Sequence, residues 1–296
     1  MTFLWYHLAS VDFSQWQKMG SSLANHPTLI ATAIVMMPIN WLLESRKWRL
    51  LNFNFLSLRR TDSLKAVLAG TYLSLFTPNR IGDMAGRVFL TPPPARKKAA
   101  TASFYGSVAQ LTITVLLGSI ASFWIYAEIE GVEPFTAVLL IATIITATIA
   151  YFNLEKISKR LFSILPARWN MEKHFHTSFE QSVAAKTLLL SFLRYAVFAT
   201  QFVILLKAFG IELSLLQFYS GIAVIYLVSA VVPTALLGEL GIRESVAIFV
   251  FGFWTNEPAG IFAATFALWI INLVVPAVVG GYFFNSSPHR LIRVRS

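Results

Sequence analysis

Long apolar stretches constrain this chain more than any other feature. Residues 99–127, 134–152 and 258–288 contain no charged residue, and residues 187–206 contain one arginine. A helix needs roughly 20 mostly apolar residues to cross the hydrocarbon layer of a bilayer, so each stretch can span it. Residues 27–43 form a shorter fifth candidate, and residues 213–238 are long enough but are interrupted by a proline. We therefore expect an all-α polytopic membrane protein with about five to six full transmembrane helices.

Composition agrees with this class and excludes several kinds of site. Charged residues make up 13% of the chain, against roughly 25% in soluble domains. The net charge of +10 lies between apolar runs, which suits anionic lipid head groups better than nucleic acid. Cysteine is absent and the five histidines are scattered, so we expect no metal site and no cofactor.

The basic residues predict the orientation. Twenty of the 24 lysines and arginines fall in residues 44–65, 80–98, 153–186 and 289–296, whereas residues 128–134 and 207–212 contain one lysine and four glutamates. Because cytoplasmic loops are enriched in Lys and Arg, we expect residues 289–296 to be a basic cytoplasmic tail. Residues 27–288 would then form one transmembrane domain, and residues 1–26 an interfacial segment on the opposite side.

Two apolar runs are too short to span. Residues 66–79 would give a helix of about 21 Å at ~1.5 Å per residue, and residues 245–256 are fewer still. The basic loops all lie on one side of the membrane if each short run belongs to a re-entrant helical hairpin, which enters and leaves on the same side. Full crossing by both pieces is the alternative that the count leaves open.

Each short run adjoins a break of the same kind. "TPNRIGDMAGR" (77–87) and "VPTALLGELGIRE" (232–244) both order proline, glycine, acid, glycine and arginine. Proline ends a helix and glycine permits a turn. Paired Gly/Pro-interrupted segments in two halves of a transporter indicate an inverted repeat with its binding site at the breaks, where irregular backbone lines a cavity.

The charged residues of these breaks predict a head-group site. A planar guanidinium suits bidentate phosphate binding, and a half-helix N-terminus favours an anion. The alternative is an ion-pair lock with a purely structural role. The predicted lipid-head-group site comprises Pro78, Arg80, Gly82, Asp83, Arg87, Gly238, Glu239, Gly241, Arg243 and Glu244.

Other polar residues within the apolar stretches are weaker candidates for lining a cavity. Hydrogen bonds between helices are the alternative for the neutral ones, and an arginine can also extend toward the interface. These candidates are Asn40, Glu44, Arg194, Gln201 and Asn272. A kink is expected near Asn272, four residues before Pro276.

With "SFLRYAVFATQF" (191–202) between them, the two motifs resemble the lysylphosphatidylglycerol synthase transmembrane, or flippase-like, family over roughly residues 28–285. The resemblance implies a membrane domain that moves an aminoacylated anionic phospholipid across the bilayer of a bacterial cytoplasmic membrane. In the family a separate soluble domain synthesises this lipid. Because the sequence ends at "HRLIRVRS", we expect no aminoacyltransferase domain. The family's lipid site maps onto Pro78, Arg80, Gly82, Asp83, Arg87, Gly238, Glu239, Gly241 and Arg243.

We accordingly expect a lipid flippase, not an enzyme, whose partners are the membrane and a phospholipid or lipid-linked phosphate. No Walker sequence for ATP is present. An intramembrane enzyme acting on a lipid phosphate or a polyprenyl-linked sugar is one alternative, and a non-transporting accessory subunit is another. A homo-oligomer and a separate lipid-modifying enzyme remain open as partners.

Overall fold

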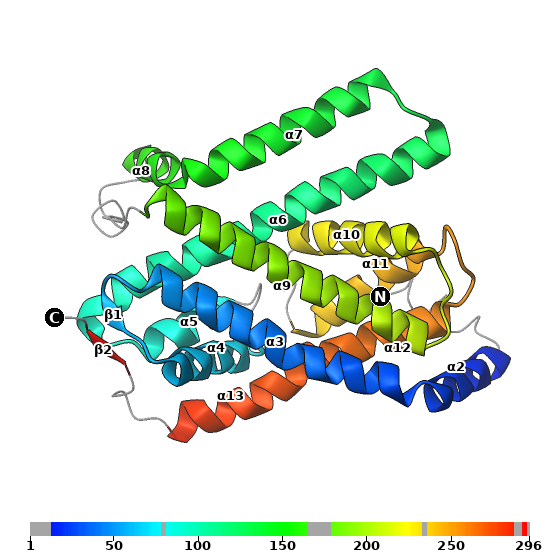
Figure 1. Cartoon of the computed structure of the whole chain (residues 1–296), viewed down its shortest axis with the longest axis horizontal. Helices are drawn as coiled ribbons and strands as arrows, with labels where there is room; N and C mark the ends of the chain where they lie inside the picture. Colours follow the sequence, from blue (N-terminus) through cyan, green and yellow to red (C-terminus); the bar gives the residue numbers. More distant parts are fainter. Residues whose placement is uncertain (1–12, 78–80, 165–178, 233–235, 287–291, 295–296) are drawn as a thin grey trace. The chain divides into compact units, whose positions relative to one another are not determined.

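The computed structural model describes residues 13–77, 81–164, 179–232, 236–286 and 292–294, which are almost entirely helical (Figure 1). The first half contains α2 (Phe13–Asn25), α3 (Pro27–Leu51), β1 (Leu56–Ser57), α4 (Arg60–Ser74), α5 (Ile81–Phe89), η2 (Pro93–Ala95), α6 (Arg96–Glu130) and α7 (Pro134–Phe152). The second contains α8 (Leu154–Ile164), α9 (Gln181–Ala208), α10 (Leu215–Val231), α11 (Leu236–Phe251), α12 (Pro258–Trp269), η5 (Ile270–Val274), α13 (Val275–Ser286) and β2 (Arg293–Val294).

Five helical segments are long and apolar enough to cross a membrane. They are Pro27–Leu51, Pro93–Glu130, Pro134–Phe152, Gln181–Ala208 and Pro258–Ser286. Each corresponds to one of the apolar stretches, so the prediction of an all-α multi-pass membrane protein is confirmed at its lower count of five. The apolar helix Leu215–Val231 falls short of that length.

The chain forms two compact units, and several long helices contribute residues to both. Unit 1 comprises residues 1–40, 117–140 and 195–275, and unit 2 comprises residues 41–116, 141–194 and 276–296. The first motif, residues 77–87, belongs to unit 2, and the second, residues 232–244, belongs to unit 1. We describe each unit by itself.

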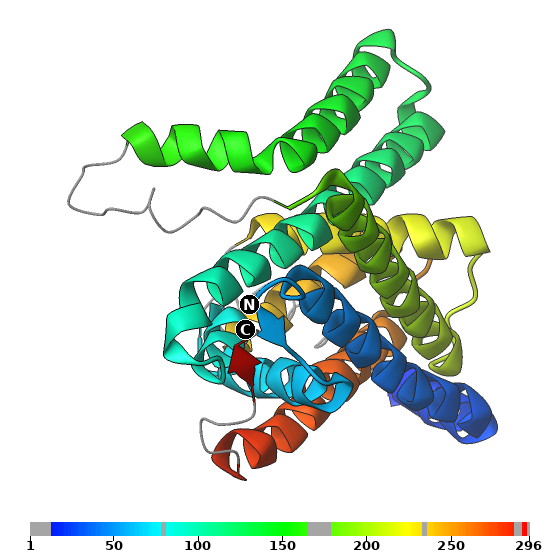
Figure 2. The same ribbon diagram turned by 60° about the vertical axis from the view of Figure 1, so that its left-hand side comes forward.

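Unit 2 is built around the end of α3. Trp48, Leu51 and Phe55 are buried in a core that also includes Leu56 and Ile292. Ile292 precedes β2, which pairs antiparallel with β1 in the register Leu56 to Val294 (Figure 2). The described part of the predicted basic tail therefore packs against the loop that follows α3.

Helices α4 and α5 pack closely in unit 2 because glycines replace larger side chains where they meet. A Cβ atom at Gly86 would lie 2.7 Å from Cα of Gly70, and one at Gly82 would collide with the carbonyl group of Leu73. Gly82 and Gly86 are four residues apart, which is the small-residue spacing that lets membrane helices approach closely. This packing fixes the face on which the charged residues of α5 lie.

We predict that Gly86→Ala lowers the free energy of unfolding by about 1–3 kcal/mol, the range found for overpacked sites. The added methyl group would meet backbone atoms of Gly70 and Ala69, which cannot rotate away. Denaturant titration in mixed micelles measures the effect. The matched control is Gly20→Ala on α2, where a Cβ atom has nothing within 4 Å. Equal stability of the two variants would contradict the packing argument.

Unit 1 contains α10, the helix α11 and the segment from α12 to η5. α10 packs against α11 where Gly221 leaves room for the ring of Phe251. A Cβ atom added at Gly221 would lie 2.7 Å from Cε1 of that ring. The residues around Asn272, where a kink is predicted, form the π-helix η5. Pro276 has no N–H to donate to the carbonyl of Asn272, so the regular helical ladder is interrupted at this point.

Candidate functional site

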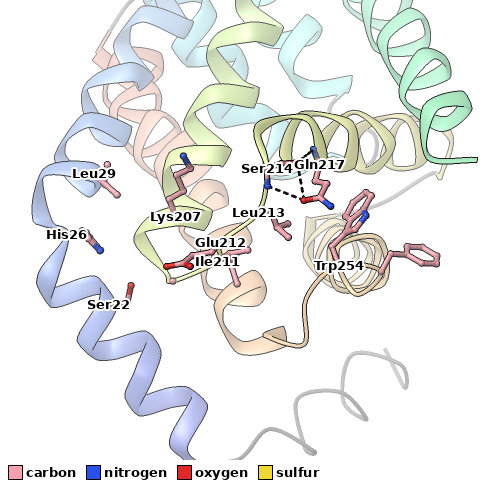
Figure 3. Close-up of a pocket in the computed structure, with 12 residues that line it drawn as sticks. Ser22, His26, Leu29, Lys207, Ile211, Glu212, Leu213, Ser214, Gln217 and Trp254 are labelled. Carbon is pink, nitrogen blue, oxygen red and sulfur yellow. Dashed lines mark hydrogen bonds between the residues drawn. The ribbon is translucent and has the colours of Figure 1, made fainter. Parts of the chain in front are cut away.

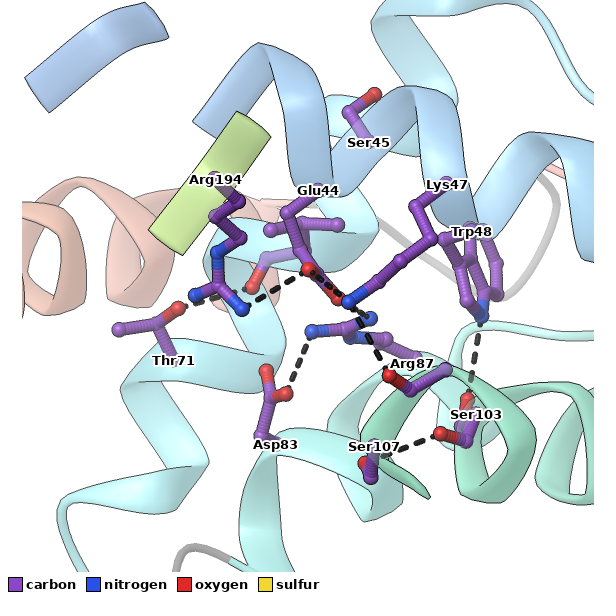
Figure 4. Close-up of polar contacts among 12 residues, drawn as sticks. Glu44, Ser45, Lys47, Trp48, Thr71, Asp83, Arg87, Ser103, Ser107 and Arg194 are labelled. Carbon is purple, nitrogen blue, oxygen red and sulfur yellow. Dashed lines mark hydrogen bonds and ion pairs between the residues drawn. The ribbon is translucent and has the colours of Figure 1, made fainter. Parts of the chain in front are cut away.

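Five charged side chains of unit 2 gather between three helices (Figure 4). We call them the charge cluster: Glu44 and Lys47 from α3, Asp83 and Arg87 from α5, and Arg194 from α9.

Glu44 lies at the centre of the charge cluster because all three cations contact its carboxylate. Oε1 accepts a hydrogen bond from Nη1 of Arg87 at 2.7 Å. Oε2 lies 2.8 Å from Nζ of Lys47 and 3.0 Å from Nη1 of Arg194. Arg87 is shared in turn, since its Nη2 donates to Oδ2 of Asp83 at 2.5 Å. Arg87 therefore bridges the two acids.

Hydrogen bonds to neighbouring helices hold the α3 side of the cluster in place. Nζ of Lys47 donates to the carbonyl of Gly106 on α6 at 3.2 Å, and Nε1 of Trp48 donates to Oγ of Ser103 at 3.2 Å. Oγ of Ser63 on α4 donates to the carbonyl of Ser45 at 2.7 Å. Glu44 is thus presented from a segment tied to both α4 and α6.

The start of α5 is also fixed. The N–H of Gly82 donates to the hydroxyl of Thr77 at 2.7 Å, which satisfies one of the orphan donors of a helix N-terminus. Asp83 lies in the first turn and Arg87 in the last turn, one helical turn apart on the same face. This spacing allows the two side chains to pair while Arg87 reaches Glu44.

The charge cluster is buried at one side and open at the other. Glu44, Lys47 and Arg87 are at most 6% exposed in their side chains, whereas Arg194 is 24% and Asp83 34% exposed. Of these five side chains three are cations and two are carboxylates, so the five together have a net charge of +1. Ionised groups at membrane depth normally pair or face a pathway, and an anion at the Asp83 and Arg194 edge would complete the balance.

Of the predicted first-motif residues, the structure brings Asp83 and Arg87 together with Glu44 and Arg194. Gly82 lies at the α4 contact. Pro78 and Arg80 lie outside the described residues.

The second motif lies on α11 in unit 1. Gly238 and Glu239 belong to this helix, but the surroundings of these two residues lie outside the described part of the chain. Gly241 and Glu244 are buried, Arg243 is half-buried, and Oγ of Ser245 donates to the carbonyl of Gly241 at 2.6 Å. The assignment of these residues to a head-group site stays a prediction.

One expectation about the motif glycines is wrong. We expected them to permit turns, but Gly82, Gly86 and Gly238 lie within helices. In the described ranges the glycines with positive φ are Gly131 and Gly210. In the first motif the glycines instead remove side-chain bulk, because α4 approaches α5 too closely for a Cβ atom.

Two of the neutral candidates hydrogen bond across helices of unit 1. Nδ2 of Asn272 donates to Oε1 of Gln201 at 2.8 Å, and Nε2 of Gln201 donates to the carbonyl of Ala33 at 2.7 Å. The amides of Gln201 and Asn272 thus join α9, η5 and α3. Asn40 is buried on α3.

Lys47 was missed by the sequence reasoning, although a signal was available. It follows Glu44 by three residues, which places both on one helix face. We had counted it among the solvated basic residues, but it is 2% exposed.

Among the described residues, no group of three or more His, Asp or Glu side chains could hold a metal ion. Comparison with protein families matches residues 1–280 to the lysylphosphatidylglycerol synthase TM region. No curated protein and no solved structure matches the chain significantly.

Proposed function

Because the chain belongs to the family of lysylphosphatidylglycerol synthase transmembrane regions, we propose that it moves an anionic or aminoacylated phospholipid, or another lipid-linked phosphate, across the membrane. The charge cluster would hold the head group while the acyl or prenyl chains stay in the bilayer. The motif helices would act as re-entrant hairpins of an inverted repeat, and the C-terminus would lie in the cytoplasm.

The observation that carries this proposal is the net positive charge of the five side chains in the cluster. A phosphodiester has one negative charge, which equals the excess of the three cations over Glu44 and Asp83. Guanidinium groups present parallel N–H donors that match two phosphate oxygens. Arg194 is the cation nearest the open edge by exposure, so it would contact the phosphate first.

Asp83, the more exposed of the two carboxylates, could also bind part of the lipid head group. Asp83 is held by Arg87, and an entering phosphate would compete with it for that guanidinium. The released carboxylate could then receive an ammonium group of an aminoacylated head group. Arg243 and Glu244 of the second motif provide the same pair of charges, and we propose that they serve the same chemistry.

A structural ion-pair lock is the second candidate, because Glu44, Lys47 and Arg87 are almost completely buried. In that role the cluster would hold α3, α5 and α9 together in a non-transporting subunit. The two candidates differ in what the excess charge does. A structural lock does not require the excess positive charge, whereas phosphate binding depends on that charge.

The direct experiment reconstitutes the full chain into vesicles that contain fluorescent phosphatidylglycerol. We expect the lipid to become accessible to a membrane-impermeant quencher faster than in protein-free vesicles, and mass spectrometry should recover it chemically unchanged. The same rate with and without protein would contradict transport. A covalently altered lipid would favour an intramembrane enzyme instead.

A further inference from the structure

Unit 1 contains a pocket of about 920 Å³ that has no part in the charge cluster (Figure 3). It lies where α2 meets α3, at the C-terminal end of α9, at the start of α10 and after α11. Its polar lining comes from Ser22, His26, Lys207, Glu212, Ser214, Gln217 and Trp254. The volume falls within the range of small-molecule sites.

Local sequence makes the pocket wall rigid. α9 ends in a Schellman motif, in which the N–H of Ile211 donates to the carbonyl of Leu206 at 3.0 Å and Gly210 adopts φ +84°. α10 begins three residues later with a capping box between Ser214 and Gln217. Glu212 therefore sits in a segment that is fixed at both ends.

A contact from α2 closes one side. Oγ of Ser22 donates to the carbonyl of Ala208 at 3.1 Å. A Cβ atom at Gly210 would lie 3.3 Å from the same hydroxyl. The pocket is thus formed by elements that are already joined, without a ligand to hold them.

Lys207 and Glu212 supply opposite charges to this pocket but do not pair with each other. Within the described ranges neither forms an ion pair, and both are exposed. Nζ of Lys207 lies 5.8 Å from the ring centroid of the buried Phe218, which holds the ammonium group over an aromatic face. Trp254 adds a second aromatic side chain to the lining.

The rim indicates an amphiphilic ligand. Phe253, which lines the pocket, is 54% exposed, and Leu215 and Leu216 at the start of α10 are 60% and 56% exposed. A polar pocket beside exposed apolar side chains suits a molecule with a charged head and an apolar tail. A fully soluble ligand would gain nothing from such a rim.

We propose that this pocket binds a zwitterionic phospholipid head group, with the phosphate at Lys207 and the ammonium group at Glu212 (Figure 3). The chains would lie along Phe253, Leu215 and Leu216. The inference rests on the proposed function, because it supplies a second lipid site, in unit 1.

Native mass spectrometry of the full chain in nonionic detergent tests this site. The probes are dioleoyl phosphatidylethanolamine, dioleoyl phosphatidylglycerol and free phosphoethanolamine. We expect phosphatidylethanolamine to bind the wild type, and Lys207→Gln and Glu212→Gln each to weaken it by about tenfold, the loss expected for one charge-assisted contact. The matched controls Lys156→Gln and Glu128→Gln change exposed residues outside the pocket and should bind as the wild type does.

Unchanged binding in Lys207→Gln and Glu212→Gln would overturn the site. Phosphatidylglycerol binding that is as strong, and insensitive to Glu212→Gln, would overturn the zwitterionic ligand. Equal binding of free phosphoethanolamine would overturn the role of the apolar rim.

The same variants in the vesicle assay separate this inference from the proposed function. Binding that depends on Lys207 and Glu212, in a protein that transfers no lipid, would leave the pocket in place and remove the transporter. Lipid transfer by a protein that shows no such binding would support the transporter and remove the pocket as a lipid site.

Discussion

Replacing Glu44 by glutamine is expected to destabilise the protein strongly, by roughly 3–5 kcal/mol of unfolding free energy, the usual cost of removing one partner from a buried ion pair. Glu44 is the acid shared by Lys47, Arg87 and Arg194. After the change, Asp83 would be left as the one carboxylate of the cluster, where it forms an ion pair with Arg87.

Glutamine has nearly the same shape as glutamate, so any loss of stability in this variant comes from the missing charge and not from altered packing. Lys47 would still donate to the carbonyl of Gly106, but its positive charge would no longer be matched nearby. Two buried cations and a half-exposed arginine would repel one another in a region from which water is largely excluded.

Chemical denaturation in mixed micelles measures the difference between Glu44→Gln and the wild type. Glu128→Gln is the matched control, because Glu128 is exposed at the end of α6 and such surface changes usually stay within about 0.5 kcal/mol. Stability of Glu44→Gln equal to that of the control would show that Glu44 does not balance the buried cations.

The spans could be predicted because a single local property, apolar length, decides them. The five apolar stretches became the five candidate spans. The helix boundaries near the motifs were less accurate: α4 begins at Arg60, six residues before the apolar run 66–79. Residues 60–65, which include Arg60, Asp62 and Lys65, can extend a helix once its other end is packed, and counting apolar residues does not detect this.

The charge cluster could be predicted in part. Asp83, Arg87, Glu44 and Arg194 stood out because each is costly within an apolar segment. Their grouping around Glu44 depends on pairings between α3, α5 and α9 that are far apart in sequence. Lys47 was missed because its buried position depends on a contact with the carbonyl of Gly106 on α6, which is far away in sequence.

Replacing Arg194 by glutamine is expected to slow transfer of phosphatidylglycerol by roughly 10- to 100-fold, the loss of a charge-assisted contact with the phosphate. This change removes the excess positive charge and leaves two cations with two carboxylates. Because Arg194 is 24% exposed and Glu44 keeps its pairs with Lys47 and Arg87, we expect the variant to fold.

Arg194→Lys separates charge from geometry. It keeps the positive charge but loses the planar fork that binds two phosphate oxygens. Transfer by this variant should therefore fall between that of Arg194→Gln and that of the wild type. Lys156→Gln, which removes one exposed cation from α8, is the control for the general loss of a positive charge.

The transfer rate of phosphatidylglycerol in vesicles containing Arg194→Gln, compared with the wild type and Lys156→Gln at equal amounts of folded protein, tests the head-group site most directly. We predict a large loss in Arg194→Gln and wild-type transfer in Lys156→Gln. Unchanged transfer in Arg194→Gln, with stability preserved, would contradict phosphate binding and favour a structural ion-pair lock.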